Sequence, residues 1–194
     1  DHNARAHRLH ILRQEHWGRG VVTRRRLLCA PSSAWTALAL AALSADNDGW
    51  NGYTLRFVIS SALVPKTFTQ VRLSFQAGAA EGLDLAGTYI GLKGAGAYDF
   101  AATPAQVLFG GSGTLSLAAN GTLVSDAVTL SGTTSDSIVV SVYCNSATDT
   151  FRISGSNDAN YSSAYKFGND LTTLTASGYS AYIARNFIYS MEVA

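Results

Sequence analysis

The sequence predicts an all-β fold, an antiparallel β-sandwich of jelly-roll type, preceded by a basic N-terminal arm and one short helix. Residues 34–194 contain 16 Gly, 19 Ser and 16 Thr. These small residues are mixed with the β-branched and aromatic residues that favour strands. Short runs of alternating apolar and polar residues recur between turn-forming residues, and no regular helical pattern alternates with them.

Charge divides the chain into a basic arm and a mildly acidic body. The whole chain carries 14 basic and 13 acidic side chains, for a net charge of +1. Residues 1–33 hold seven arginines and two acids, whereas residues 34–194 hold seven basic and eleven acidic side chains. We interpret the arm as an electrostatic anchor, with a solvated tail as the alternative and no signal for specific nucleic-acid binding. The expected anchoring arginines are Arg13, Arg19, Arg24, Arg25 and Arg26.

The apolar stretch 34–43 has two interpretations. As a retained helix capped by Ser32 or Ser33, it would place Trp35, Leu38 and Leu43 against the sandwich or a sister subunit. As part of an export signal, it would be cleaved off with the rest of residues 1–45. It is too short for a membrane span, which needs about 20 residues. We favour the helix and expect an arm of residues 1–45 followed by a sandwich of residues 46–194.

Strands are expected wherever apolar residues alternate, beginning with residues 53–59, where Tyr53, Leu55, Phe57 and Ile59 share one face. Glycine-rich and Asn-Gly turns separate the strands. Cys144 is expected to be a buried apolar residue, with a disulfide to Cys29 as the alternative. The expected strands after the first are residues 71–75, 88–92, 105–109, 114–117, 122–130, 137–144, 150–153, 180–184 and 186–193.

The histidine distribution argues against an enzyme. The block Ser135-Asp136-Ser137 approximates the nucleophile motif of an esterase family, but no histidine follows His16 to act as its base. We therefore expect Ser137 to open a strand. No pair of carboxylates can be nominated for glycoside hydrolysis, and no cofactor is expected.

The loops of the body contain two features that favour binding. Asp46-Asn47-Asp48-Gly49 offers oxygen ligands for Ca²⁺, although a plain Asx turn is the simpler interpretation and no metal site is expected. Aromatic residues also stand beside amides and carboxylates, a pairing suited to the apolar face and hydroxyl groups of a sugar. The candidate glycan-binding residues are Trp50, Tyr98, Asp99, Asn157, Asp158, Asn160, Tyr161 and Tyr165.

Residues 46–194 also resemble a family, the β-sandwich modules of tailed-phage and gene-transfer-particle virion proteins, which are similar to modules beside α-proteobacterial secreted hydrolases. The resemblance implies a fibre, spike or decoration subunit of a virion that is oligomeric, contacts sister subunits and other virion proteins, and touches cell-surface polysaccharide. The alternative is an exported carbohydrate-binding module. The segments that carry the resemblance are Gly52-Tyr53-Thr54-Leu55-Arg56, Val71-Arg72-Leu73-Ser74-Phe75, Gly87-Thr88-Tyr89-Ile90-Gly91, Tyr98-Asp99-Phe100, Leu108-Phe109-Gly110-Gly111 and the terminal strand 187–193.

Overall fold

The computed structural model describes residues 34–194, which fold as an all-β sandwich with one 3₁₀ turn, η1 (Ser61–Leu63). The anchoring arginines of the arm and Cys29 lie outside the described residues. The strands are β1 (Thr36–Ala37), β2 (Leu43–Asn47), β3 (Tyr53–Ile59), β4 (Phe68–Gln76), β5 (Leu83–Leu92), β6 (Ala105–Gln106), β7 (Leu115–Leu117), β8 (Thr122–Val124), β9 (Val128–Gly132), β10 (Ile138–Cys144), β11 (Phe151–Ser154), β12 (Tyr161–Phe167), β13 (Ser180–Ala181) and β14 (Ser190–Val193).

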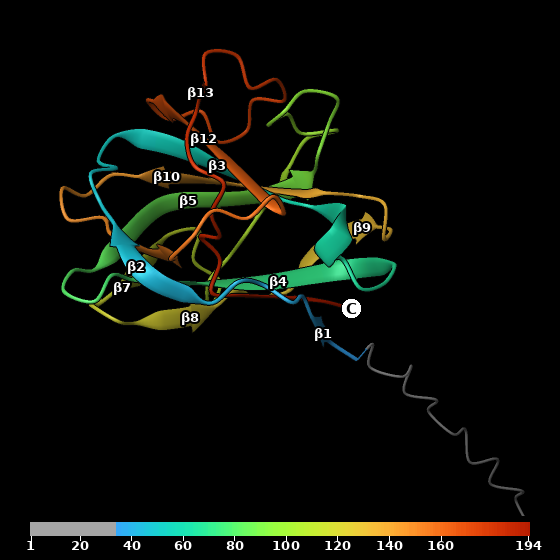
Figure 1. The fold of residues 1–194 in the computed structure, drawn as a ribbon, viewed down its shortest axis with the longest axis horizontal. Coiled ribbons are helices and arrows are strands. Elements are labelled where there is room, and N and C mark those ends of the chain that lie inside the picture. The colour runs from blue at the N-terminus through green and yellow to red at the C-terminus, as the bar shows by residue number, and fades with distance from the viewer. Residues whose placement is uncertain (1–33) are drawn as a thin grey trace, which may run out of the picture. The chain divides into compact units, whose positions relative to one another are not determined.

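Two antiparallel sheets form the layers of the sandwich (Figure 1). The larger sheet has the order β13-β12-β3-β10-β5-β6, with β7 also paired to β5. The smaller sheet has the order β1-β14-β4-β8, with β9 also paired to β4, and a separate ribbon joins β2 to β11. Most neighbouring strands are far apart in the chain, so the topology depends on long-range pairing.

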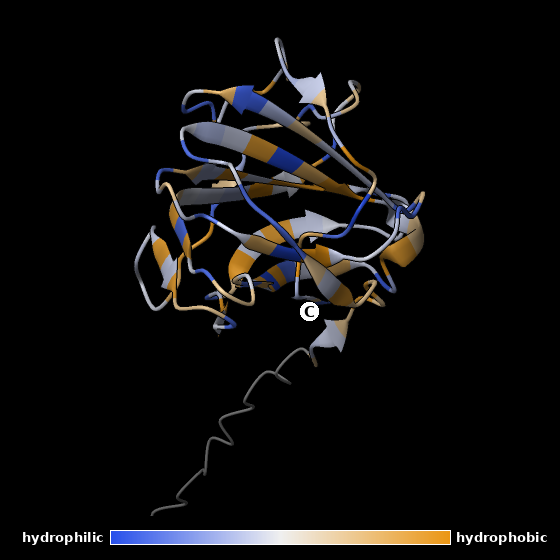
Figure 2. Ribbon diagram, turned by 60° about the vertical axis from the view of Figure 1, so that its left-hand side comes forward, coloured by the Kyte–Doolittle hydropathy of each residue, from blue (hydrophilic) through white to orange (hydrophobic). Residues whose placement is uncertain are grey.

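The core between the sheets is built from aromatic and branched aliphatic side chains. Phe57 of β3 stacks on Phe187 with ring centroids 4.4 Å apart, and Phe151 of β11 packs edge-on against both. As expected, Tyr53, Leu55, Phe57 and Ile59 all contact this core. Hydrophobic and hydrophilic residues alternate along several strands (Figure 2), as a half-buried sheet requires.

The helix expected over residues 34–43 is wrong, because these residues pair with the sandwich. In β1, Thr36 lies opposite Val193, and Ala45 of β2 lies opposite Ile153 of β11. Leu38 is only 6% exposed and belongs to the core. Strand pairing and core burial outweigh the helix propensity of Ala and Leu.

Residues 34–45 therefore belong to the sandwich. Asn186 donates a hydrogen bond to the Ala41 carbonyl (2.7 Å), and the Ala41 N–H donates to the Tyr161 hydroxyl (2.8 Å). Cleavage before Asp46 would remove β1 and most of β2 together with these contacts. The contacts favour a folded unit that begins near residue 34 rather than at residue 46.

Most of the other expected strands are present, but those expected over 105–109, 180–184 and 186–193 shorten to β6, β13 and β14, and two further differences are informative. Residues 122–130 form two strands, β8 and β9, and both pair with β4. Strand β12 was not predicted, although Tyr161, Ser163, Tyr165 and Phe167 alternate along it. No helix in the described part of the chain is long and apolar enough to cross a membrane.

Candidate functional site

The candidate glycan-binding residues do not form one site. Trp50 and Tyr165 lie together near β13, and Tyr98 and Asp99 lie in a loop over the outer face of the larger sheet. Residues 157–161 lead into the opposite end of β12. Each of these places offers different chemistry.

The first place is a cluster of five aromatic rings, here called the aromatic patch: Trp50, Tyr53, Tyr165, Phe167 and Tyr182. The Trp50 ring packs against Tyr53, Tyr165 and Tyr182, with centroid distances of 5.0–6.0 Å. Tyr53 also meets Phe167 edge-on at 5.3 Å. Register explains the grouping, because Tyr53 lies opposite Phe167, and Leu55 opposite Tyr165, on neighbouring strands. The sequence-based set contained only Trp50 and Tyr165.

The outer rings of the aromatic patch are open to solvent. The Phe167 side chain is 73% exposed and Tyr182 is 39% exposed. Phe167 lies so close to Gly52 that a Cβ there would stand 3.0 Å from its ring, and Gly52 has a positive φ of 81°. A side chain at position 52 would therefore displace the Phe167 ring or strain the backbone.

A chain of two hydrogen bonds through Asn47 joins Trp50 to Tyr182 within the aromatic patch. The Trp50 indole N–H donates to Asn47 Oδ1 (2.8 Å), and the Asn47 amide donates to the Tyr182 hydroxyl (2.9 Å). Because that hydroxyl accepts a hydrogen bond from the Asn47 amide, its own O–H remains free to donate one. The edge of the patch thus combines an exposed ring face with a hydroxyl donor.

Trp50 and Tyr161 are wrong as sugar-binding residues, because their rings are buried and present no free face. Trp50 is 7% exposed and forms the floor of the aromatic patch, so it supports the outer rings but offers no free face. Tyr161 is 5% exposed, and its hydroxyl accepts the Ala41 N–H. Burial raises the pKa of the Tyr161 phenol. Strand alternation turns both Tyr161 and Tyr165 toward the interior side of the sheet, but only Tyr165 reaches the aromatic patch.

The second place is a loop pair that covers Arg56. Asp99 accepts hydrogen bonds from the N–H groups of Gly96 (3.2 Å) and Ala176 (2.7 Å), so it holds its own loop and joins it to residues 168–179. Tyr98 contributes its carbonyl to Arg56 (3.0 Å). Tyr98 and Asp99 therefore hold the two loops that cover Arg56, and protein N–H groups already bind the Asp99 carboxylate.

Arg56 is fully buried on the outer face of β3 beneath these loops. Its guanidinium donates to the carbonyls of Tyr98, Asp170 and Thr173 and lies 4.7 Å from the ring centroids of both Phe100 and Tyr179. The charge is thus stabilised by carbonyl dipoles and ring quadrupoles. Within residues 34–194, its Nε and the cross-strand Ser141 hydroxyl have no hydrogen-bond partner.

Two titratable groups beside Arg56 are perturbed. Burial raises the pKa of Tyr179 to about 12, although the Arg56 charge works in the opposite direction. Burial also disfavours ionisation of Asp170, but hydrogen bonds from Lys166 and Thr173 outweigh it and lower the pKa of that carboxyl. The Asp170 carboxylate, held by Lys166 and Thr173, is therefore a counter-charge to Arg56 in the network that fixes these loops.

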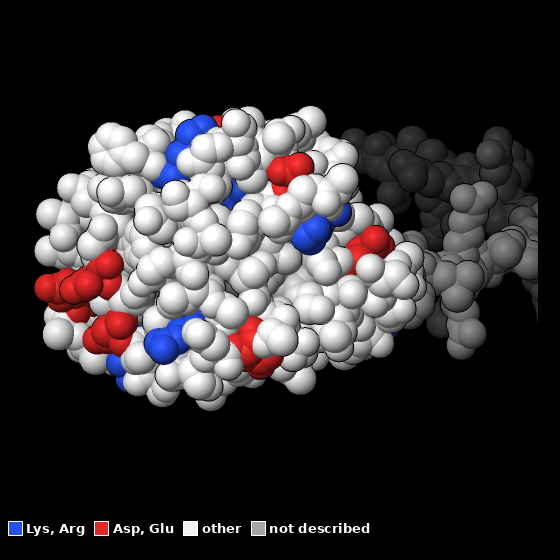
Figure 3. All heavy atoms as spheres, turned by 45° about the horizontal axis from the view of Figure 1, so that its top comes forward, with Lys and Arg blue, Asp and Glu red and all other residues white. Residues whose placement is uncertain are grey.

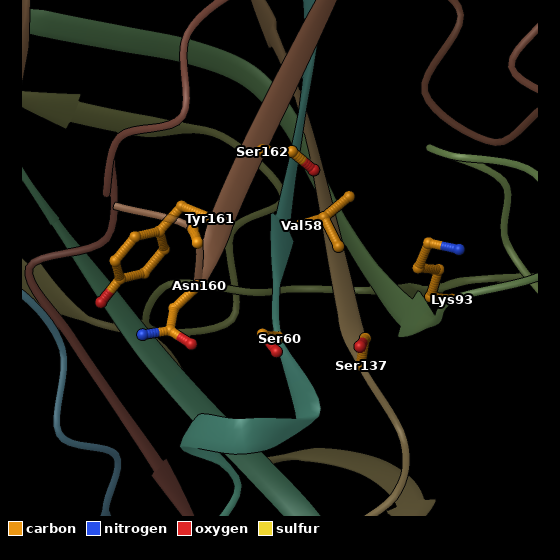
Figure 4. Close-up of a pocket in the computed structure, with 8 residues that line it drawn as sticks. Val58, Ser60, Lys93, Ser137, Asn160, Tyr161 and Ser162 are labelled. Carbon is orange, nitrogen blue, oxygen red and sulfur yellow. The ribbon is translucent and has the colours of Figure 1, made fainter. Parts of the chain in front are cut away.

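The third place is a small pocket of about 130 Å³, here called the serine pocket (Figure 4). It lies where β3 ends and β12 begins, and Figure 4 shows the Tyr161 ring pointing away from Lys93. Asn157 and Asp158 do not line it: Asn157 accepts a hydrogen bond from Arg185, and Asp158 caps the turn before Asn160. The lining residues are Val58, Ser60, Lys93, Ser137, Ala159, Asn160, Tyr161 and Ser162.

The esterase-like block folds as a turn followed by a strand. Asp136 accepts hydrogen bonds from the N–H and hydroxyl of Thr133, both 2.8 Å, and its pKa is lowered by them. Ser137 accepts a hydrogen bond from the Ser61 N–H (3.0 Å). Ile138, Val140, Val142 and Cys144 follow and pack into the core, as the alternation predicted.

Two of the oxygen ligands that a calcium site would need, those of Asp46 and Asn47, already bind protein groups. Asp46 forms an ion pair with Arg152 (2.6 Å) and accepts the Ala79 N–H, while Asn47 holds Trp50. No cluster of three His, Cys, Asp or Glu side chains suited to a metal occurs among residues 34–194.

The anchoring residues that the structure describes are attached to the sandwich itself. The Arg72 guanidinium lies 4.5 Å from the centroid of the Trp35 ring and pairs with Glu192 (2.5 Å). Leu38 is in the core, and Leu43 is half-buried in β2. Trp35, Leu38 and Leu43 therefore hold residues 34–47 to the body of the sandwich.

On the face of the sandwich drawn in Figure 3, the Lys, Arg, Asp and Glu side chains are few and are scattered among wide uncharged areas.

Comparison with models of known protein families and with curated protein sequences finds no match to this chain.

Proposed function

We propose that this chain is a non-enzymatic structural protein of a virion, in which the sandwich is displayed outward and contacts cell-surface glycan through the aromatic patch. The exposed Phe167 ring, packed edge-on against Tyr53, and the Tyr182 hydroxyl of the same aromatic patch carry the proposal. An apolar side chain that is 73% exposed gains stability only when something covers it.

A pyranose ring suits this surface. Its axial C–H groups present an apolar face to an aromatic ring, while its hydroxyls need donors and acceptors at the rim. Phe167 supplies the ring, and Tyr182 and Asn47 supply polar groups in a fixed relay. The rings are held by mutual edge contacts and by β12, so little side-chain entropy is lost on binding.

The experiment measures binding of neutral gluco-, manno- and galacto-hexaoses to the full chain by isothermal titration calorimetry. Phe167→Ala and Tyr182→Ala are expected to weaken binding at least tenfold, because each removes part of the platform. Tyr189→Ala is the matched control, since Tyr189 is a 50% exposed aromatic residue outside the patch. Unchanged binding by both patch variants would contradict the proposed contact.

The virion role is tested separately with the arm. Deletion of residues 1–33 removes seven arginines and leaves every described strand intact. The deleted protein is expected to fold, with an unchanged far-ultraviolet spectrum, but to be missing from purified particles. Normal incorporation of the deleted protein would contradict the anchoring role of the arm.

A further inference from the structure

We propose that the serine pocket is a second saccharide site, and that it takes the carboxylate-bearing ring of a hexuronic acid. This inference rests on the proposed glycan-binding function and names an acidic sugar as part of the ligand. The pocket is separate from the aromatic patch: Ser60 and Ser162 lie at one end of the β3–β12 pair, and Tyr53 and Phe167 at the other.

The lining supplies groups that pair with sugar hydroxyls. Ser60 Oγ accepts the Ala62 N–H (3.2 Å), and Ser137 Oγ accepts the Ser61 N–H (3.0 Å). Because both oxygens already act as acceptors for backbone donors, each hydroxyl is oriented and retains its proton for a ligand. The Asn160 amide and the Ser162 hydroxyl add donors and acceptors from the other wall.

The charge of the pocket selects the ligand. Lys93 is the one charged side chain in the lining, and no carboxylate lines the pocket. Its ammonium donates to the Gly94 carbonyl (3.2 Å), which leaves two protons for a ligand. In Figure 4 Lys93 stands at the rim of the pocket with its ammonium directed outward from Ser60 and Ser137, so a ligand carboxylate would be met at the rim and a ring hydroxyl at the serine wall.

The neighbouring acids do not enter the pocket. Asp136 is held by Thr133, and Asp158 Oδ1 accepts the Asn160 N–H (2.8 Å) within its own turn. Neither carboxylate lines the pocket. Val58 and Ala159 add an apolar wall, and the volume of about 130 Å³ holds one sugar ring in part rather than a longer chain segment.

The test is a titration of the full-length, ¹⁵N-labelled protein with glucuronate and galacturonate, followed by amide chemical shifts. We expect shifts at Ser60, Lys93, Ser137 and Ser162 and millimolar dissociation constants, which weaken as salt is added. Lys93→Gln is expected to weaken binding at least fivefold. Lys66→Gln is the control, because it removes the same charge outside the lining. Lys93→Gln changes no core contact, so loss of binding is separable from loss of folding.

Four outcomes would overturn the inference: no shift at the pocket, shifts confined to residues 1–33, equal affinity for glucose, and equal affinity for acetate. Equal affinity for glucose would show that the carboxylate of the ligand is not recognised. Equal affinity for acetate would show that the sugar ring is not recognised. These outcomes do not decide the proposed function, which is tested separately by the binding of neutral hexaoses to the Phe167 and Tyr182 variants. Glucuronate binding that survives Phe167→Ala but not Lys93→Gln would support the pocket alone.

Discussion

The Arg56 guanidinium carbon lies 4.7 Å from the centroid of the Tyr179 ring, and this contact joins a central strand to a loop more than a hundred residues later in the chain. Arg56 also holds the carbonyls of Tyr98 and Thr173, so one buried cation closes both loops over the larger sheet. The outer face of β3 is buried for this reason.

Substitution of Arg56 is expected to open this cover. Arg56→Ala leaves the carbonyls of Tyr98, Asp170 and Thr173 without their donor, which costs about 2–4 kcal/mol of unfolding free energy. Arg152→Ala is the control, because its partially exposed ion pair with Asp46 is worth about 0–1 kcal/mol. Urea denaturation measures both, and limited proteolysis should show new cuts in residues 94–101 and 168–179. Equal effects of the two substitutions would show that Arg56 does not hold the loops.

Tyr179 is expected to make the fold sensitive to alkaline pH. Its pKa is raised to about 12 in the folded protein, whereas a free tyrosine ionises near 10. The folded state therefore keeps a proton that the unfolded state releases, so this stabilisation is complete below pH 10 and is lost as pH rises toward 12. In Tyr179→Phe the unfolding free energy should depend less steeply on pH between 10 and 12. Titration followed by absorbance at 295 nm should also show one fewer tyrosine that ionises late, at high pH. The Tyr161 phenolate, whose pKa burial also raises, should remain, so an unchanged number of late phenolates in Tyr179→Phe would contradict the assignment.

Removal of residues 1–45 is expected to destabilise the sandwich more than removal of residues 1–33. The longer deletion takes away β1, most of β2 and the buried Leu38. Leu38 alone contributes about 1.5–3 kcal/mol, which corresponds to a fall in Tm of about 3–12 °C for a domain of this size. Differential scanning calorimetry of the two proteins makes the comparison, and equal Tm values would place residues 34–45 outside the cooperative unit.

Cys144 is expected to be unreactive in the folded protein. Its side chain is fully buried, and burial followed by the charge of Asp149 raises the pKa of its thiol. In Cys29→Ser, where Cys144 is the remaining thiol, a disulfide reagent should react only after guanidinium is added. Rapid reaction of Cys144 under native conditions would mean that the end of strand β10 opens. Intact-mass measurement of the unmodified chain tests the predicted alternative, a Cys29–Cys144 disulfide.

The site was predictable only in part, for reasons visible in β12. The alternation of Tyr161, Ser163, Tyr165 and Phe167 carries a strand signal, but it stands beside the loop-like residues Asn157-Asp158-Ala159-Asn160. Assigning the aromatics to a loop made Tyr161 a binding residue and overlooked Phe167. Of the serine pocket the sequence nominated only Asn160 and Tyr161 as binding residues, since the hydroxyl groups of the pocket come from three separate segments.

By itself the sequence determined the all-β class, the inward faces of β3 and β10 and the burial of Cys144, because period-two alternation is a local property of a strand. It also determined that no histidine follows residue 16. Only the tertiary structure decided that residues 34–47 pair as strands, that Arg56 is buried, and that five aromatic rings from distant segments meet. Each of these depends on which segments become neighbours, and long-range pairing is set by the burial of the whole core rather than by any one segment.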